Sequence, residues 1–385
     1  MPLSSNRFSL KTKSGRSRAF PSAISTKETP LFRLLFLLLF CLTLPLPAAA
    51  SWTARISSHS PEYFLAADKS QKLLFQVETK NSVPSVTRQF NCIHGRLEGD
   101  KQKEGDLRTP EGVYFITHKI TQKLDFMEYG PHAFNLNYPN PADRLRGKTG
   151  SGIWLHSKGQ PITGLTTRGC MAIDQYELTD LLPVLAPGTP VIIAEHLEGS
   201  PFLQNTPLAS LPASAAGTTP LSGPTSLGTE APTLPAAPST PDEAHPAPLP
   251  AGADTAQALL PEKSLSAASS GDDEKVLRQT LLWMDSRQQN SEDIFNMYDR
   301  QNYPRASREK FSSLRKRMYS DFRRQKDLFL DREGIRLLAG PGYWVSCFIK
   351  SYERKGVYHH GLQALYWMPD EGGEFRIIGE VWINN

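Results

Sequence analysis

Cysteine is scarce in this sequence, and its scarcity limits the chemistry that the chain can carry. The 385 residues include four cysteines, none of which forms a CxxC pair or lies near a histidine at zinc-finger spacing. We therefore expect no structural metal site and no bound metal. Cys41 lies in the N-terminal leader described below, and the remaining odd number, Cys92, Cys170 and Cys347, leaves at least one thiol free.

Aromatic residues are absent from one long segment, Leu203 to Leu282, and such a segment cannot bury a core. Thirteen prolines fall between Gly199 and Asp272 without a repeat period. This composition predicts a partly extended, disordered linker over residues 199–272. The linker separates two domains, and because Cys92 and Cys347 fall in different ones, we predict three free thiols.

A leader precedes the first domain. The first 33 residues carry seven Lys or Arg and one acid, and an almost purely apolar run follows. Ala48 and Ala50 fit the small-x-small rule for cleavage, which predicts a signal peptide over residues 1–50. The alternative is an uncleaved membrane anchor, but Pro45 and Pro47 leave the run shorter than the roughly 20 residues that a span needs. In either case we expect export to the periplasm or cell envelope.

Removing the leader changes the charge balance. The whole chain has 43 Lys and Arg against 39 Asp and Glu. Without the seven bases and one acid of the leader, 36 bases and 38 acids remain, a net charge of about −2 by the same counting. The basic surplus belongs to the leader, so a nucleic-acid partner loses its main support.

The first domain, residues 51–198, is predicted to be mainly β. Helical signal is sparse, and one helix is indicated over residues 174–185, where leucines recur at helical spacing after an acid. Short apolar runs bounded by turn residues indicate strands, which begin near Leu73, Val113, Gly152 and Pro190.

The last domain, residues 273–385, places helices before strands, which favours an α+β fold. Amphipathic patterns indicate one helix over residues 276–290 that continues past Ile294, and another over residues 307–325. Long alternating runs indicate antiparallel strands, which begin near Trp344, Gly361 and Glu374.

The segment with the most chemical information reads GIWLHSKGQPITGLTTRGCMAI. His156 ends an apolar strand, and Cys170 follows Gly169 fourteen residues later. A catalytic cysteine needs a base, because its ordinary pKa near 8.5 leaves only a few per cent thiolate at neutral pH. Gly169 lets consecutive backbone N–H groups turn toward one point, as an oxyanion hole requires. The alternative interpretation is that this spacing arises by chance, and that the residues are a buried thiol and an ordinary core histidine.

These residues resemble the signature of the L,D-transpeptidases, the YkuD-type cysteine enzymes of peptidoglycan. That family places His-Gly or His-Ser on a strand and a Ser/Thr-His-Gly-Cys loop some fourteen or more residues later; here His156-Ser157 and Thr167-Arg168-Gly169-Cys170 stand in those places. The family's upstream signature matches as well, in the segments Gly99-Asp100-Lys101 and Gly105-Asp106-Leu107-Arg108-Thr109-Pro110-Glu111-Gly112-Val113-Tyr114. The resemblance covers residues 73–194.

The resemblance implies a role for each matching residue and no organic cofactor. Cys170 would be the nucleophile, His156 the base and then the acid, and the Ser157 carbonyl would fix the imidazole tautomer. The backbone around Gly169 and Cys170 would hold the oxyanion. Substrate contacts would come from the loop and its surroundings, with the candidates Thr167, Arg168, Arg108, Lys101 and Trp154.

Two departures from the family pattern leave the exact reaction open. Arg168 replaces the usual loop histidine, and Ala172 stands where Arg or Asn is common. Our first hypothesis is a transpeptidase that acts on stem tetrapeptides through a Cys170 acyl-enzyme. The alternatives are an L,D-carboxypeptidase that trims tetrapeptide to tripeptide for cell shape, and a wall-binding scaffold without turnover.

The last domain resembles the nuclear-transport-factor-2-like (SnoaL-like) fold in its element order and its terminal FRIIGEVWI run. Such a module follows the catalytic domain in known cell-shape enzymes that trim stem peptides. Residues 308–326 contain eight bases and two acids around an apolar stripe. This basic helix is either a solvated face or a site for an anionic cell-envelope polymer.

A second group of chemically active residues, Cys92-Ile93-His94-Gly95, also combines a thiol with an imidazole. No donor loop and no apolar strand end frame it. We therefore predict a structural role for this segment.

Overall fold

The computed structural model describes residues 55–56, 61–81, 83–197, 200–204 and 270–384. The predicted leader and most of the predicted linker lie outside these ranges. Among the described residues, no helix has the length and apolar character needed to cross a membrane.

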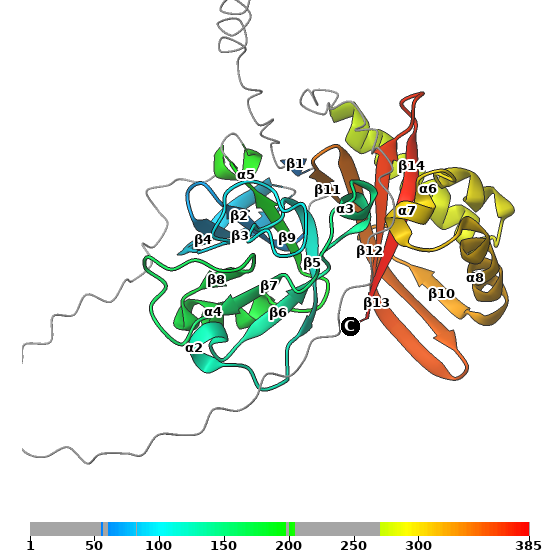
Figure 1. Ribbon diagram of the computed structural model, residues 1–385. Coiled ribbons are helices and arrows are strands. Elements are labelled where there is room, and N and C mark those ends of the chain that lie inside the picture. The colour runs from blue at the N-terminus through cyan, green and yellow to red at the C-terminus, as the bar shows by residue number, and fades with distance from the viewer. Residues whose placement is uncertain (1–54, 57–60, 82, 198–199, 205–269, 385) are drawn as a thin grey trace, which may run out of the picture. The chain divides into compact units, whose positions relative to one another are not determined.

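An eight-stranded sheet forms the first domain, in the order β4-β3-β2-β9-β5-β6-β7-β8 (Figure 1). Its strands are β2 (Tyr63–Asp68), β3 (Leu73–Lys80), β4 (Val83–Asn91), β5 (Gly112–Lys119), β6 (Ala133–Leu136), β7 (Trp154–Ser157), β8 (Met171–Ile173) and β9 (Pro190–Ala194). Most pairs are antiparallel, but β2–β9 and β7–β8 are parallel. Every residue of β9 is buried, as its central place between β2 and β5 requires. The prediction of a mainly β domain is confirmed.

Short helices fill the connections of this domain. They are α2 (Phe126–Tyr129), α3 (Pro141–Leu145), α4 (Gln175–Leu181), the 3-10 helix η1 (Leu182–Val184) and α5 (Pro201–Gln204). The helix predicted over residues 174–185 corresponds to α4 and η1. Asp174 caps it by accepting a hydrogen bond from the Tyr176 N–H, and Leu178 and Leu181 are buried. Its last turn is 3-10 at Pro183, which cannot donate to an α-helical ladder.

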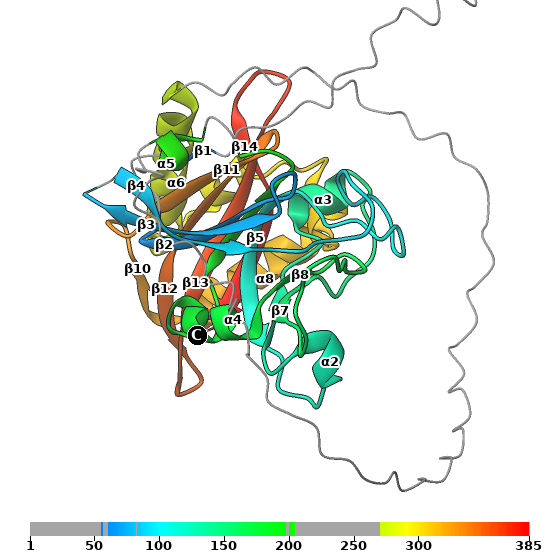
Figure 2. The same cartoon turned by 90° about the vertical axis from the view of Figure 1, so that its left-hand side faces the viewer.

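The C-terminal part contains a six-stranded antiparallel sheet with the order β1-β11-β12-β13-β14, in which β10 also pairs with β12. The strands are β1 (Arg55–Ile56), β10 (Lys326–Leu330), β11 (Arg336–Gly340), β12 (Tyr343–Arg354), β13 (Val357–Pro369) and β14 (Phe375–Asn384). Figure 2 shows β12, β13 and β14 side by side over most of their length. The strand β1 comes from the segment that the sequence assigns to the first domain.

Helices cover one face of this second sheet. They are α6 (Ser270–Gln288), the 3-10 helix η3 (Glu292–Met297), α7 (Tyr303–Ser307) and α8 (Phe311–Arg324). The predicted continuation past Ile294 is a separate element, because Asn290 adopts a left-handed φ of 54° and Ser291 caps the new turn. The two helices and three long strands predicted from the sequence are present.

The second sheet is apolar on both faces. On β12, Trp344 and Phe348 pack into a core with the helices. Tyr343, Val345 and Cys347 alternate with them and belong to a different core, which contains buried residues of the first sheet. Successive side chains of a strand point to opposite faces, so β12 stands between the helices and the first domain.

The two predicted domains therefore share a core. This shared core joins residues of the first domain, such as Phe64, Phe115 and Ile192, to residues of the last, such as Tyr366 and Ile378. The linker that separates these residues in the sequence does not keep them apart in the structure. The three thiols are nevertheless free, as predicted.

Candidate active site

The parallel pairing of β7 with β8 brings His156 and Cys170 to one place. Leu155 pairs with Met171 and His156 with Ala172, and Cys170 directly precedes β8. Because paired residues share a face and side chains alternate, Cys170 lies on the same face of this ladder as Trp154 and His156. The Cys170 thiol is partly exposed and lies 3.6 Å from the carbonyl oxygen of Gly152.

His156 is almost fully buried, and one of its ring nitrogens has a defined partner. Its Nδ1 atom lies 2.6 Å from the carbonyl oxygen of Ser157. A carbonyl oxygen only accepts hydrogen bonds, so Nδ1 carries the proton and Nε2 keeps its lone pair. Ser157 is itself buried, and its backbone N–H donates to the carbonyl of His132. The imidazole is thus held in the tautomer that a general base needs.

Burial sets the charge of both groups. It lowers the pKa of His156 to about 4, because the hydrogen bond to Ser157 only partly offsets the loss of hydration. Burial also raises the pKa of Cys170, although the backbone N–H of Trp154 and the positive charges of Arg168 and Lys158 act in the opposite direction. At neutral pH the resting imidazole and the resting thiol are therefore both uncharged.

Gly169 gives the loop before Cys170 its shape. Its φ is +134°, and a Cβ there would lie 2.8 Å from the carbonyl oxygen of Arg108. The Gly169 N–H donates to Thr167 Oγ1 at 3.0 Å, so it is already engaged within the loop. The expectation that the backbone around Gly169 and Cys170 holds the oxyanion stays a prediction. Within this loop, the backbone N–H of Cys170 is the neighbouring candidate for an oxyanion donor.

Thr167 and Lys101 were expected to contact substrate, but both are buried and bonded inside the protein. Thr167 Oγ1 donates to the Cys170 carbonyl at 2.7 Å. Lys101 forms an ion pair with Asp106 at 2.7 Å. Burial alone would raise the pKa of Asp106, but hydrogen bonds from Lys101 and from backbone N–H groups lower it to about 2. The polar groups of both residues are thus engaged within their loops, and their contact with substrate stays a prediction.

Arg108 and Arg168 remain as cationic candidates. Arg168 is exposed and lies next to Cys170 in the chain. Arg108 is half-buried, and its Nε atom is buried without a hydrogen-bond partner among the residues that the structure describes. A buried guanidinium N–H without a partner is costly, so it is a position where a ligand oxygen would be bound favourably.

Trp154 is half-buried and forms part of an aromatic wall. The Tyr129 ring lies 5.3 Å from Trp154 and 5.2 Å from His156, measured between centroids. Next to Tyr129, Glu128 forms an ion pair with the buried Lys158 at 2.9 Å. Sequence reasoning missed Tyr129, Glu128 and Lys158. Lys158 could have been noted for its place after the His-Ser pair, whereas no local pattern connects α2 to β7.

Thr109 was also missed as a site residue, although the upstream signature contains it. This threonine is fully buried, and its Oγ1 donates to the Gly169 carbonyl at 3.0 Å while accepting from the Gly95 N–H at 2.9 Å. It connects three segments that are distant in sequence. Through the hydrogen bond from Thr109, the upstream signature therefore holds the Cys170 loop in place.

The segment Cys92 to Gly95 forms a border of the same loop. Ile93 and Ala172 exchange backbone hydrogen bonds of 2.8 and 2.9 Å, and Thr167 N–H donates to the His94 carbonyl. Cys92 is buried, and burial raises its pKa to about 12. These contacts agree with the predicted structural role and make Cys92 a poor nucleophile.

Comparisons with known proteins agree with this geometry. Residues 62–193 match the family model of the L,D-transpeptidase catalytic domain, YkuD. This part of the chain is therefore a catalytic domain of the L,D-transpeptidase family. No curated protein sequence matches the chain.

Several solved structures are similar at low identity. Bd1075 of Bdellovibrio bacteriovorus is 19% identical over 87% of this chain and 98% of its own, with a TM-score of 0.48. The helical cell shape determining protein Pgp2 of Campylobacter jejuni is 20% identical over 86% of this chain and 94% of its own, with a TM-score of 0.48. An L,D-transpeptidase of Xylanimonas cellulosilytica is 17% identical over 43% of this chain and 70% of its own, with a TM-score of 0.24.

Proposed function

We propose that this protein is an exported peptidoglycan L,D-transpeptidase that uses Cys170 as its nucleophile and His156 as its base. The observation that carries the proposal is the state of His156. Its Nδ1 is held at 2.6 Å from the Ser157 carbonyl, and burial lowers its pKa to about 4. A neutral imidazole with a free Nε2 on the same strand face as a thiol can accept the thiol proton.

The chemical steps follow from these groups. The Sγ–H proton of Cys170 passes to Nε2 of His156 while Sγ bonds to the carbonyl carbon of the stem-peptide amide. The carbonyl oxygen becomes an oxyanion, for which the Cys170 N–H is the proposed donor. The C–N bond then breaks, and the imidazolium gives its proton to the departing D-alanine amine. A second amine attacks the thioester, releases the thiol and forms the new amide.

The substrate is a stem tetrapeptide, whose carboxylates need cationic partners. We assign this task to Arg108 and Arg168. The Arg108 Nε lacks a partner within the described part of the chain, and Arg168 is exposed beside Cys170. The Tyr129 and Trp154 rings offer an apolar wall for the aliphatic part of a diamino acid.

The products decide between transfer and hydrolysis. Purified protein incubated with disaccharide-tetrapeptide should yield cross-linked dimers, whereas tripeptide without dimers would assign the protein to the carboxypeptidases. Cys170→Ala should abolish either product, and product formed by that variant would overturn the assignment. Mass spectrometry should locate a carbapenem adduct on Cys170, while an unmodified folded protein would instead favour a scaffold without turnover.

The C-terminal part supports a proposal for a partner, an anionic cell-envelope polymer at α8. A cavity of about 630 Å³ lies beside this helix. Four bases, Lys316, Arg317, Lys350 and Arg354, line it with two acids, Asp321 and Glu380. Burial lowers the pKa of Lys350 to about 8, which an anion would reverse.

Co-sedimentation with a polyanionic wall polymer tests this partner. We expect binding that weakens with salt, and loss of binding in a Lys316→Glu, Arg354→Glu variant. Binding that these changes leave intact would count against the site. We also propose that residues 273–385 adopt the nuclear-transport-factor-2-like fold and that residues 1–50 form a signal peptide.

A further inference from the structure

One edge of β5 is closed by side chains. At Gly112–Phe115 this strand pairs with β9, and its pairing with β6 begins only at Ile116. The Val113 N–H donates to the Tyr343 hydroxyl at 2.8 Å, and the Val113 carbonyl accepts from Asn140 Nδ2 at 3.1 Å. The C-terminal domain thus supplies a hydrogen-bond acceptor to the central sheet of the catalytic domain.

Tyr343 lies where the upstream signature enters β5. Its hydroxyl also accepts a hydrogen bond from Asn140 Nδ2 at 3.1 Å. A Cβ on Gly112, where φ is +146°, would lie 2.7 Å from the same hydroxyl oxygen. The approach is therefore close enough that the residue before Val113 has to be glycine.

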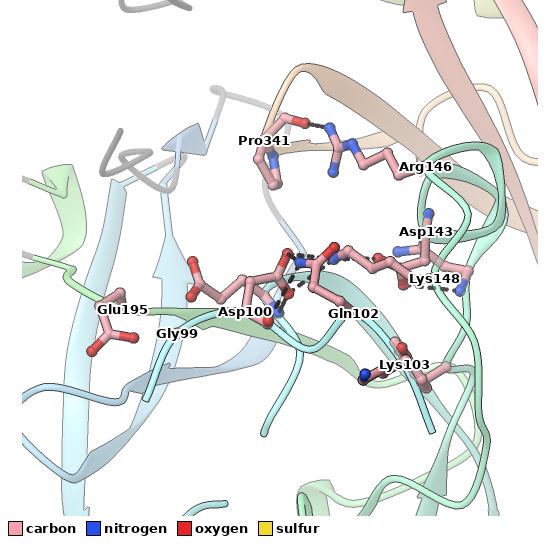
Figure 3. Close-up of polar contacts among 12 residues, drawn as sticks. Gly99, Asp100, Gln102, Lys103, Asp143, Arg146, Lys148, Glu195 and Pro341 are labelled. Carbon is pink, nitrogen blue, oxygen red and sulfur yellow. Dashed lines mark hydrogen bonds and ion pairs between the residues drawn. The ribbon is translucent and has the colours of Figure 1, made fainter. Parts of the chain in front are cut away.

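A network of buried and partly buried charged side chains runs from this point back to the signature loop. Asn140 and Asp143 cap α3 reciprocally, and Asp143 also accepts from Tyr114. Lys148 forms ion pairs with Asp143 at 2.9 Å and Asp100 at 2.6 Å (Figure 3). Asp100 in turn accepts from the backbone N–H of Glu111 at 2.9 Å.

The loop that this network holds is hydrogen-bonded to the loop that carries Cys170. Glu111 is fixed a second time by the buried Lys69 at 2.9 Å. Two residues earlier, Thr109 donates to the Gly169 carbonyl. The path from the Tyr343 hydroxyl to the Cys170 loop thus consists of hydrogen bonds, ion pairs and a short stretch of strand.

We propose that Tyr343 of the C-terminal domain is a positioning residue for the active site. Its hydroxyl accepts hydrogen bonds from the Val113 N–H and from Asn140, and it thereby fixes the start of β5. Through Thr109 it also fixes the position of the Cys170 loop. The inference rests on the proposed function of Cys170. Its consequence is that docking of the C-terminal domain is needed for full reactivity of the thiol.

Tyr366 provides a matched control. Its ring stacks on Tyr343 with centroids 5.9 Å apart, and both rings are fully buried in the shared core. The Tyr366 hydroxyl instead accepts from Asn137 Nδ2 at 3.0 Å, and Asn137 accepts from the Phe115 N–H at 2.8 Å, farther along β5 from Thr109 than Val113 is. Tyr343→Phe and Tyr366→Phe therefore each remove one hydroxyl oxygen from the same interface, but we expect only Tyr343→Phe to displace the Cys170 loop.

The test measures acylation of Cys170 by a carbapenem in the full chain. We expect Tyr343→Phe to lower the maximal acylation rate about tenfold with unchanged half-saturation, because a small misplacement of a nucleophile is costly. Tyr366→Phe should stay within about twofold of the wild type, and the two variants should lose similar thermal stability. Equal acylation rates in both variants, or a wild-type rate in Tyr343→Phe, would overturn the inference.

A second measurement separates this inference from the proposed function. Alkylation of Cys170 by iodoacetamide, followed against pH, reports on the loop even in a protein that is not acylated. A loosened loop hydrates the thiol, so the pKa of Cys170 should fall in Tyr343→Phe and stay unchanged in Tyr366→Phe. Failure of acylation in the wild type would refute the function alone, whereas identical alkylation profiles would refute the role of Tyr343.

Discussion

Thr109 Oγ1 donates a hydrogen bond of 3.0 Å to the carbonyl oxygen of Gly169, the residue that precedes Cys170. The same oxygen accepts from the Gly95 N–H at 2.9 Å, and the threonine is fully buried. A single hydroxyl therefore joins the upstream signature, the Cys170 loop and the segment that borders it. We therefore expect the position of the Cys170 loop to depend on this contact.

Replacing Thr109 by Val should damage stability and reactivity together. The change keeps the shape but leaves the Gly95 N–H and the Gly169 carbonyl unsatisfied, which costs about 1–3 kcal/mol of unfolding free energy. Thr280→Val is the control, because Thr280 is equally buried and donates only within α6, to the Val276 carbonyl. Urea unfolding measures the stability of the two variants, and carbapenem acylation measures the reactivity of Cys170 in each. Acylation slowed equally in the two variants would show that the effect is not local.

The pH dependence of stability should carry the signature of His156. Its pKa falls from 6.5 to about 4 on folding, so the unfolded chain binds more protons between these values. Stability contributed by the neutral imidazole is present above pH 6.5 and is lost as pH falls to 4, by about 3 kcal/mol. Glu177, with its pKa raised to about 7, acts in the opposite direction, with stability lost as pH rises from 4.5 to 7.

A variant separates the two contributions. His156→Gln cannot titrate, so the difference in unfolding free energy between wild type and variant should shrink as pH is lowered from 7 to 4.5. Urea unfolding at both pH values measures it. A difference that does not change with pH would mean that His156 is not held neutral in the folded protein.

Arg108 and Arg168 should affect catalysis in different ways. Arg108→Gln removes a proposed carboxylate partner, so we expect KM for the tetrapeptide to rise about tenfold with little change in kcat. Arg168→Gln also removes a charge that lowers the pKa of Cys170, so the thiol pKa should rise. Arg96→Gln is the control, since Arg96 is exposed and its backbone borders the same loop. A matching KM increase in that variant would point to a general charge effect.

Cutting the chain between Gln204 and Ser270 should not separate its two parts. Their common core includes fully buried residues of both, among them Phe115 and Tyr366, and exposing this surface to water is costly. With a protease site inserted into residues 205–269, the two fragments should still co-elute after cleavage. Size-exclusion chromatography reads the outcome. Two separate peaks would restore the picture of independent domains.

Local patterns in the sequence were sufficient for the elements and for the central pair of the candidate site. Short apolar runs bounded by turn residues predicted β3, β5, β7 and β9, because strands that are buried on both faces read as nearly continuous apolar segments. His156 and Cys170 were identifiable because β7, the loop and β8 are neighbours in sequence. The carbonyl group that fixes the tautomer of His156 belongs to Ser157, the next residue in the sequence.

Only the tertiary structure decided which polar side chains of the candidate site are buried and bonded inside the protein and which are exposed. Lys101 and Thr167 bond to groups in their own loops, Asp106 and the Cys170 carbonyl, but the burial of these loops depends on packing that no local period encodes. For the same reason the alternation of β12 could not reveal that Tyr343, Val345 and Cys347 meet the first domain instead of water. Periodicity reports that a face is apolar, whereas the identity of what covers it depends on contacts between residues far apart in the chain.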